Sequence, residues 1–167
     1  MEKKSRKLPR LNKYDYSSNG KYFVTICVKD MKCVLSSVVG SGDPDAPQVL
    51  LKEYGAVVEE NIKTMNSIYS DIVAEKYVIM PNHIHIIISI ESANFSGASG
   101  SPLPTNSKLS QYIGTLKRFC NKQIGANIWQ TGFYDHIIRD EEDYLNHIQY
   151  IDENPKKWVL GKDKYYI

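Results

Sequence analysis

The sequence lacks any long uninterrupted run of apolar residues, which bears on where the protein works. A membrane-spanning helix needs about 20 consecutive, mostly apolar residues, and no segment of the 167-residue chain approaches that length. The N-terminal residues also lack the apolar stretch of a secretory signal peptide. We therefore expect a cytoplasmic protein with no membrane partner.

Cysteine is scarce as well, with three residues in the chain. Cys27, Cys33 and Cys120 form no Cys-x-x-Cys pair, and their odd number does not suit a disulfide framework. We expect these thiols to be reduced and mostly buried. This excludes the class of small secreted domains that disulfides hold together.

The net charge of +2 is small, but basic residues are concentrated in two places. Residues 1–14 hold six of them against one acid, and Lys117, Arg118 and Lys122 form a second group. A basic arm can bind a phosphate backbone, although a solvated terminus has the same composition. The basic residues of this arm are Lys3, Lys4, Arg6, Lys7, Arg10 and Lys13.

The order of apolar and turn-forming segments predicts one domain over residues 1–167. A Ser-, Gly- and Pro-rich segment at 91–107 predicts a flexible loop inside it. The alternation of strands and helices suits an α+β ferredoxin-like or RRM-like sandwich, with helices packed on one face of an antiparallel sheet. The expected elements are a strand at 22–28, a hairpin within 33–51 with its loop at Gly40–Pro47, a helix at 52–65, strands at 71–80 and 83–90, a helix at 108–125, a strand at 132–140, and a helix from 140 until Pro155 ends it.

Two histidines stand one residue apart in the isoleucine-rich strand PNHIHIII, residues 81–88. Side chains two residues apart on a strand point to the same face, so His83 and His85 share one face while Ile84 and Ile86 share the other. The isoleucine face suits a core. The histidine face offers two imidazoles to one divalent ion, although a His-x-His pair alone is weak evidence for a metal site.

The last predicted helix has an apolar stripe and a polar stripe on a helical wheel. The polar stripe is about 60° wide at the 3.6-residue period and places Tyr150 and Asn154 one turn apart, within side-chain reach. Each of the two also has a purely structural interpretation, as an edge tyrosine and as a helix-stop asparagine before proline. The apolar stripe contains Tyr144, Ile148 and Ile151, and the polar stripe contains Asp143, His147, Tyr150 and Asn154.

Together the two segments suggest a metal-dependent active site. His83 and His85 with the amide oxygen of Asn154 would supply three ligands, and imidazole with oxygen donors suits Mn²⁺ well and Mg²⁺ acceptably. Beside such an ion, the phenol oxygen of Tyr150 could attack a phosphodiester. The phenol must lose its proton, because the ordinary tyrosine pKa is about 10, and His147 or a water could accept it.

These residues resemble the single-tyrosine HUH transposase superfamily. NHIHIII is similar to its His–hydrophobic–His motif, and IWQTGFYDHIIRDEEDYLNHIQYIDENPKKW is similar to its C-terminal signature. The Y-I-x-x-N-P context that runs from Tyr150 to Pro155 most resembles REP-associated tyrosine transposases. RKLPRLNKYDYSSNGKYFVTICV and LKRF fit as well, so the resemblance spans nearly the whole chain.

The resemblance implies a ferredoxin-like or RRM-like fold and a single-stranded DNA substrate, usually with a hairpin near the cleavage site. It implies that His83, His85 and Asn154 bind the metal. It also implies that Tyr150 is the nucleophile, which forms a 5′-phosphotyrosine and releases a 3′-hydroxyl. Related members act as monomers or as homodimers, so both assemblies are expected. Under this function, the candidates for DNA contacts are Arg10, Lys117, Arg118 and Arg139.

Two other functions fit the same residues. A non-catalytic RRM-like module could hold single-stranded nucleic acid by base stacking and phosphate contacts. A small metallohydrolase could use His83 and His85 with a water nucleophile. The polar stripe around Tyr150 favours the transesterase, because a hydrolase has no need of a tyrosine there.

Overall fold

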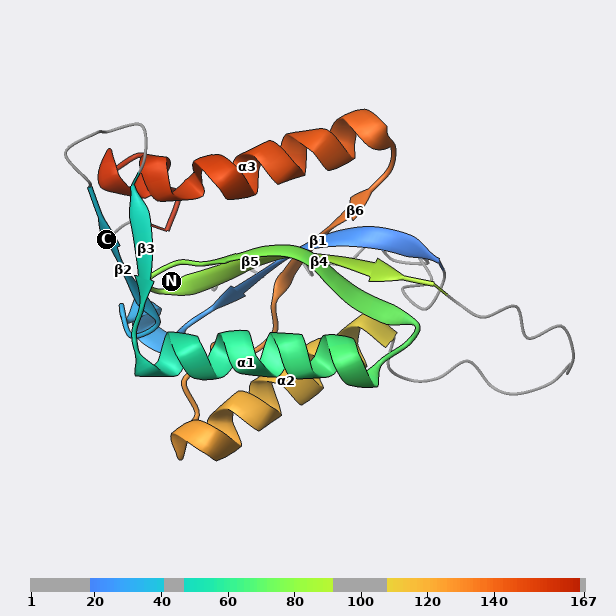
Figure 1. Ribbon diagram of the computed structural model, residues 1–167, viewed down its shortest axis with the longest axis horizontal. Coiled ribbons are helices and arrows are strands. Elements are labelled where there is room, and N and C mark those ends of the chain that lie inside the picture. The colour runs from blue at the N-terminus through green and yellow to red at the C-terminus, as the bar shows by residue number, and fades with distance from the viewer. Residues whose placement is uncertain (1–18, 41–46, 92–107, 166–167) are drawn as a thin grey trace, which may run out of the picture.

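The computed structural model describes residues 19–40, 47–91 and 108–165 (Figure 1). Arg10 with the rest of the predicted 1–14 arm, and all but Glu91 of the predicted 91–107 loop, lie outside these ranges. Within them, no helix is long and apolar enough to cross a membrane. The elements in chain order are β1 (Gly20–Cys27), a 3₁₀ turn (Lys29–Met31), β2 (Ser36–Val39), β3 (Gln48–Leu51), α1 (Glu53–Ile68), β4 (Ile72–Ile79), β5 (His83–Ile90), α2 (Lys108–Ile124), β6 (Tyr134–Ile138) and α3 (Glu141–Val159).

Four strands form an antiparallel sheet in the order β4-β5-β1-β6. With α1 and α2 they follow one another along the chain as β1-α1-β4-β5-α2-β6, which is the βαββαβ order of a ferredoxin-like fold. The β2–β3 hairpin is inserted between β1 and α1, and α3 follows β6. The predicted α+β class with an antiparallel sheet is confirmed.

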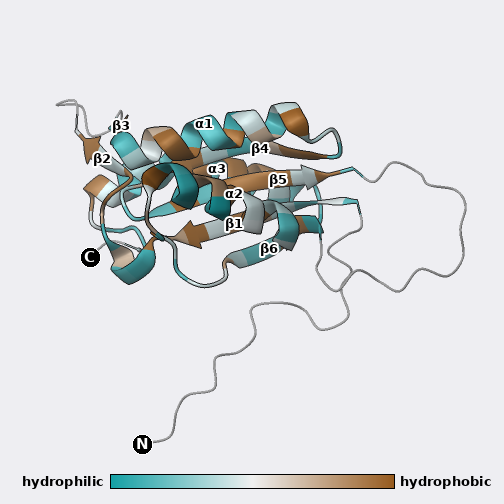
Figure 2. Ribbon diagram, turned by 90° about the horizontal axis from the view of Figure 1, so that it is seen from below, coloured by the Kyte–Doolittle hydropathy of each residue, from teal (hydrophilic) through white to brown (hydrophobic). Residues whose placement is uncertain are grey.

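One face of the sheet carries the hydrophobic core. Alternate residues of β1 and β5 point to this face, because side chains alternate across a strand, and they are aliphatic or aromatic. Helices α1 and α2 cover the face (Figure 1), and Figure 2 shows hydrophobic stretches in β4 and β5 and a mixture of hydrophilic and hydrophobic residues along α1. The strand residues of this core are Tyr22, Val24, Ile26, Ile84, Ile86, Ile88 and Ile90, each at most 1 % exposed.

Helix α3 lies on the opposite face of the sheet (Figure 1). The expectation that helices pack on one face therefore holds for α1 and α2, while α3 covers the second face and buries it too. His83, His85 and Ile87 of β5 point to this second face and are each at most 1 % exposed. Lys76 of β4 and Asp152 of α3 form an ion pair of 2.6 Å across the same interface. The predicted histidine pair is thus enclosed between the sheet and α3.

Helix α3 begins as predicted but ends later. The Asp140 side chain caps it by accepting a hydrogen bond of 2.8 Å from the Asp143 N–H. The prediction that Pro155 ends the helix is wrong, because α3 continues through this proline. Proline removes one helical hydrogen bond, but Trp158 in the last turn is buried, with its ring 6.2 Å from that of His83. Packing of this tryptophan stabilises the last turn of α3, although a proline usually ends a helix before such a turn.

Candidate active site

The two strand histidines lie side by side on the face of the sheet that α3 covers. β5 runs antiparallel to β1, with His83 opposite Cys27 and His85 opposite Thr25. The centroids of the two imidazole rings are 4.5 Å apart. Both rings belong to β5, which lies between β4 and β1, so their positions are fixed by ladder hydrogen bonds on both sides of the strand.

Each imidazole is held through its Nδ1 atom. The Nδ1–H of His83 donates to Oδ1 of Asn82 at 2.8 Å, and the Asn82 amide donates in turn to the Tyr165 carbonyl at 2.9 Å. Nδ1 of His85 lies 2.8 Å from the Thr25 hydroxyl. The Nε2 atoms of both rings have no hydrogen-bond partner among the described residues. Buried polar atoms are rarely unpaired, and metal-binding histidines are typically held through the other ring nitrogen, so these Nε2 atoms fit a metal ion.

Burial also keeps the two imidazoles uncharged. It lowers the pKa of His83 from 6.5 to about 3. Burial, with a smaller contribution from neighbouring His83, brings the pKa of His85 well below 6.5. A neutral imidazole has a free lone pair on one nitrogen and is the form that binds metals. Both rings are therefore ready to act as ligands at neutral pH.

Asn154 brings a side-chain amide from α3 to the same place. The side chain is fully buried, and neither its oxygen nor its nitrogen has a hydrogen-bond partner among the described residues. The amide nevertheless lies close enough to His83, Tyr150 and Asp163 to shift the pKa of all three. One amide oxygen and two imidazole nitrogens are a mixed donor set that fits a divalent ion.

Tyr150 reaches this centre from one turn earlier in α3. Its ring packs edge-on against that of His85, with 5.1 Å between centroids, and against that of Phe23 at 5.7 Å. Burial and then the negative charge of Asp163 raise the pKa of Tyr150 above 10, and the Asn154 amide partly offsets the rise. The phenol is therefore protonated at neutral pH, and it needs a proton acceptor before it can act as a nucleophile.

A cavity of about 250 Å³ opens beside these side chains. His85, Tyr150 and His147 all line it, so the predicted nucleophile and the candidate proton acceptor border the same space. Nδ1 of His147 lies 2.8 Å from the main-chain oxygen of Asp143 and 3.1 Å from its carboxylate. These contacts leave Nε2 of His147 as the ring nitrogen available to a bound group.

The chain is similar to several known proteins, although no family model matches its sequence. An uncharacterized protein of Haemophilus influenzae is 30% identical over 97% of this chain and 93% of its own length. A putative REP-associated tyrosine transposase of H. influenzae is 30% identical over 47% of this chain. The REP-associated tyrosine transposase of Escherichia coli K12 is 32% identical over 50% of it. This chain is therefore similar to two REP-associated tyrosine transposases over about half of its length.

This chain matches the two named transposases over about half of their own lengths, 47% and 45% respectively. A solved structure of a REP-associated tyrosine transposase bound to a REP hairpin has a TM-score of 0.62 with this chain. That likeness covers 93% of this chain and 76% of the other at 22% sequence identity, so it is a likeness of fold. It agrees with the α+β fold of this chain and its antiparallel sheet.

The basic residues for which DNA contacts were predicted lie in different parts of the structure. Lys117 and Arg118 belong to α2, which covers the face of the sheet opposite to α3 and Tyr150 (Figure 1). The Lys117 ammonium donates to two main-chain carbonyls in the 130–132 segment, one of them at 2.8 Å, and burial lowers its pKa to about 8. Arg139 stands immediately before the cap of α3 and is exposed. Of the three, Arg139 lies next to the start of the helix that carries the candidate nucleophile, and a DNA contact by any of them stays a prediction.

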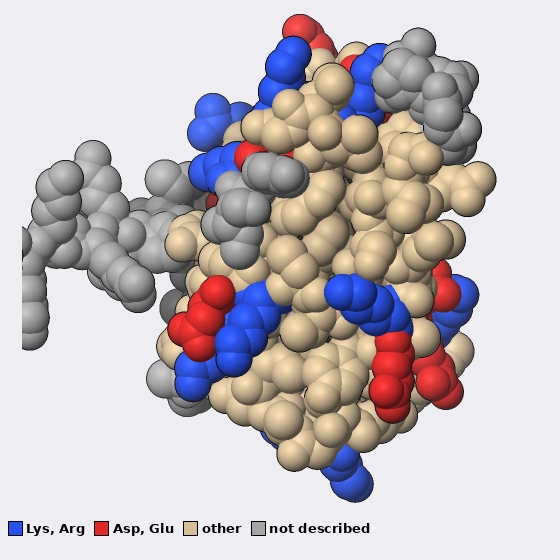
Figure 3. All heavy atoms as spheres, turned by 90° about the vertical axis from the view of Figure 1, so that its left-hand side faces the viewer, with Lys and Arg blue, Asp and Glu red and all other residues tan. Residues whose placement is uncertain are grey.

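Figure 3 shows the end of the molecule formed by the β2–β3 hairpin and the C-terminal end of α3. Basic and acidic side chains are interspersed on this face. In α3, for example, Lys157 forms an ion pair of 3.1 Å with Glu153. The described residues therefore present no continuous basic surface on this face that would attract a DNA backbone.

Sequence reasoning missed four side chains that surround the histidines. Thr25 and Asn82 position the imidazoles, while Asp163 and Tyr165 approach from the segment after α3. The Tyr165 ring lies 4.5 Å from that of His83, and Asp163 is buried with one carboxylate oxygen unpaired among the described residues. Asn82 could have been noticed because it directly precedes the histidine pair. Asp163 and Tyr165 give no signal, because the turn after α3 alone brings them to the site.

Proposed function

We propose that this chain is a metal-dependent single-stranded DNA transesterase that cleaves and rejoins DNA through a 5′-phosphotyrosine intermediate on Tyr150. The observation that carries the proposal is a set of buried, unpaired donor atoms beside that tyrosine. They are Nε2 of His83, Nε2 of His85 and the side-chain amide of Asn154. Similarity to REP-associated tyrosine transposases over about half of this chain supports the same reaction class.

His83, His85 and Asn154 would hold one divalent ion, Mg²⁺ or Mn²⁺. Two neutral imidazoles and an amide oxygen leave coordination positions for water and for a phosphate oxygen, and this mixed donor set suits Mn²⁺ in particular. When bound, the ion withdraws charge from the phosphorus of the phosphodiester and so favours nucleophilic attack.

Tyr150 is the nucleophile in this mechanism. Its phenol oxygen forms a bond to phosphorus while the bond between phosphorus and the 3′ oxygen breaks. The strand on the 3′ side of the break stays on the protein through its 5′ phosphate, and the strand on the 5′ side leaves with a 3′-hydroxyl after its oxygen takes up a proton. The phenol proton passes to His147 or to a water. His147 suits this role because it lines the same cavity as Tyr150, and its Nδ1 is held by Asp143.

The covalent product is the reason to use tyrosine instead of water. A phosphotyrosine linkage keeps the phosphodiester activated, so a 3′-hydroxyl can later attack it and restore DNA without ATP. Attack by water would release the strand and lose that linkage. The reaction class therefore suits strand transfer, which is what a transposase performs.

Single-stranded DNA with a hairpin near the cleavage site is the proposed partner. The structurally similar protein is one bound to a REP hairpin, which makes hairpin DNA the first substrate to test. Tyr150 packs against His85 within one chain, so a monomer holds every proposed catalytic residue in one site. A homodimer that exchanges α3 would not be needed to complete it.

A covalent-trapping assay tests the proposal. The full chain is incubated with labelled single-stranded hairpin DNA and Mn²⁺ and is then separated on a denaturing gel. We expect a slower-migrating protein–DNA band that disappears with a chelator and in the Tyr150→Phe variant. Tyr144→Phe is the matched control, because it removes a hydroxyl of the same helix that bonds to Glu75, and it should keep the band.

The same gel separates the alternatives. Cleavage by Tyr150→Phe without a covalent band would identify a metallohydrolase that uses water. Binding of the DNA without cleavage by the unaltered protein would identify a non-catalytic module that holds single strands. Either result would contradict the proposed transesterase.

The hydrogen bond between Thr25 and His85 provides a graded test of the metal site. We expect Thr25→Val to weaken Mn²⁺-dependent cleavage by about 10- to 100-fold, the usual effect of removing a partner of a metal-bound histidine. Valine keeps the branched shape but removes the hydroxyl that lies 2.8 Å from Nδ1 of His85. Cleavage rates over a range of Mn²⁺ concentrations measure the effect. Thr25→Ser retains the hydroxyl and should stay near the wild-type rate, so equal losses in both variants would argue against this hydrogen bond.

A further inference from the structure

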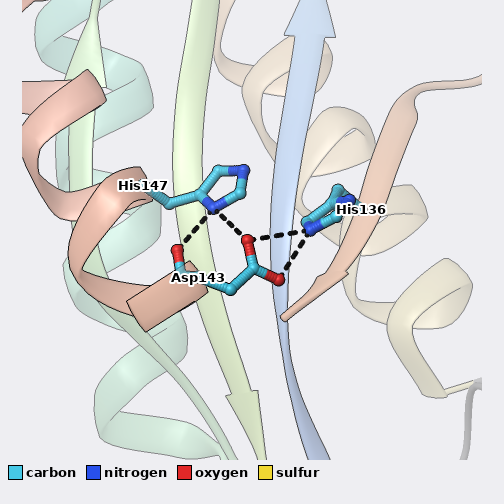
Figure 4. Close-up of side chains that lie close together, drawn as sticks. All are labelled: His136, Asp143 and His147. Atoms are coloured by element: carbon cyan, nitrogen blue, oxygen red, sulfur yellow. Dashed lines mark hydrogen bonds and ion pairs between the residues drawn. The ribbon is translucent and has the colours of Figure 1, made fainter. Parts of the chain in front are cut away.

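All four histidines of the chain are described, and they form two pairs on the same side of the sheet. His83 and His85 form the buried pair. His136 of β6 and His147 of α3 form the other pair, with Asp143 of α3 between them (Figure 4). We call these last three residues the His136 cluster.

The donor atoms of the His136 cluster converge on one point. Nε2 of His136 lies 2.8 Å and 3.1 Å from the two carboxylate oxygens of Asp143. Nδ1 of His147 lies 3.1 Å from the same carboxylate (Figure 4). One ligand atom from each residue lies within 4.8 Å of the other two, and the described residues hold no other such group of three or more His, Cys, Asp and Glu side chains.

Two elements fix this geometry. Asp143 and His147 stand at i and i+4 on α3, so they share one helix face. His136 comes from edge strand β6, where it pairs with Phe23 of β1. The backbone N–H of Arg139 also donates to the Asp143 carboxylate at 3.1 Å, which holds that carboxylate in place. The cluster is therefore pre-arranged, and it remains partly exposed, so an ion can enter from solvent.

We infer that the His136 cluster binds one divalent transition-metal ion of the zinc class, at a site separate from the proposed one at His83 and His85. Two imidazoles and one carboxylate are a donor set that zinc uses when further positions stay open to water. The Phe23 ring stands between the two sites, 5.2 Å from the ring of His85 and 4.5 Å from that of His147. The inference needs no DNA chemistry and does not depend on the proposed function. With zinc on Nδ1 of His147, Nε2 of that ring carries its hydrogen, and a water would then accept the phenol proton of Tyr150.

An ion at this site would join edge strand β6 to the first turns of α3. His147 is three residues before Tyr150 and lines the same cavity. Holding His147 and Asp143 to His136 would therefore keep the start of α3 against the sheet. The expected role is to position the helix that carries Tyr150.

Zinc titration of the full chain tests the inference. Protein stripped with a chelator is titrated with Zn²⁺ in a calorimeter, and thermal unfolding is recorded with and without Zn²⁺. The His83→Ala/His85→Ala variant should still bind one equivalent of Zn²⁺. Adding His136→Ala to it should weaken that binding at least tenfold and abolish the rise in Tm that Zn²⁺ causes. Glu142→Ala, an exposed residue of the same helical turn, is the matched control and should leave both readouts unchanged.

The inference fails if His136→Ala binds zinc as tightly as Glu142→Ala does. If the double histidine variant does not fold, the comparison is made in the otherwise unaltered chain. There, His136→Ala should lower the number of zinc equivalents by one, and an unchanged number would overturn the inference. Failure of covalent trapping with retained zinc binding would reject the transesterase and leave this site standing.

Discussion

Replacing His85 with alanine is expected to lower the rate of metal-dependent DNA cleavage by at least about 1,000-fold. The variant loses one of three proposed ligands, with its buried and unpaired Nε2. Polarisation of a phosphodiester by a metal lowers the barrier by several kcal/mol, and about 4 kcal/mol corresponds to a factor of about 1,000. His83→Ala should have an effect of the same size. Single-turnover cleavage of a labelled hairpin DNA at saturating Mn²⁺ measures both.

Two controls separate loss of the ligand from loss of binding or folding. DNA affinity measured without metal should change by less than about threefold, because contacts to phosphates and not to the metal supply most of it. Ile87→Val trims a buried side chain on the same face of the same strand and should cost about 0.5–1.5 kcal/mol of stability, with little change in rate. A His85→Ala protein that cleaves within tenfold of the wild type would contradict the ligand role.

The strand histidines could be placed from sequence because a strand has one simple period. Side chains alternate between two faces, so a His-x-His pair inside an isoleucine run determines both a core face and a histidine face. The ladder of β5 with β1 then places His83 and His85 beneath α3. The βαββαβ order was likewise predictable, because turn-forming segments separate apolar runs whose periods differ between strands and helices.

The packing of α3 was harder to predict, because a helical wheel contains no information about the surface against which the helix packs. The apolar stripe was expected to be the core face, yet Asn154 of the polar stripe is fully buried. Tyr144 of the apolar stripe is only half-buried and donates its hydroxyl hydrogen to Glu75 at 2.9 Å. The facing strands carry histidines and a threonine, so a polar stripe packs there. The partners in that layer, Asn82 and Tyr165 among them, follow from tertiary contacts that no local period encodes.

Protein without metal is expected to lose stability steeply as the pH falls from 7 to 5. Burial holds the pKa of His83 at about 3 and that of His85 well below 6.5, whereas both return to about 6.5 in the unfolded chain. Between these values the unfolded state binds more protons, so the free energy of unfolding falls as the pH falls. His83 alone should remove about 2 kcal/mol over this range, from a typical total of about 5–15 kcal/mol, and His85 should lower the stability further in the same direction.

Urea unfolding at several pH values in the presence of a chelator measures this dependence. The His83→Gln/His85→Gln variant should lose most of it, because glutamine does not titrate. An equal pH dependence in that variant would mean that the two imidazoles are not held neutral by burial. Mn²⁺ at 100 times its dissociation constant should add about 2.7 kcal/mol. This gain should persist at pH 5, because the folded protein still holds neutral ligands there. The burial that weakens the fold in acid thus keeps the lone pairs of His83 and His85 available at a pH where an exposed imidazole would be protonated.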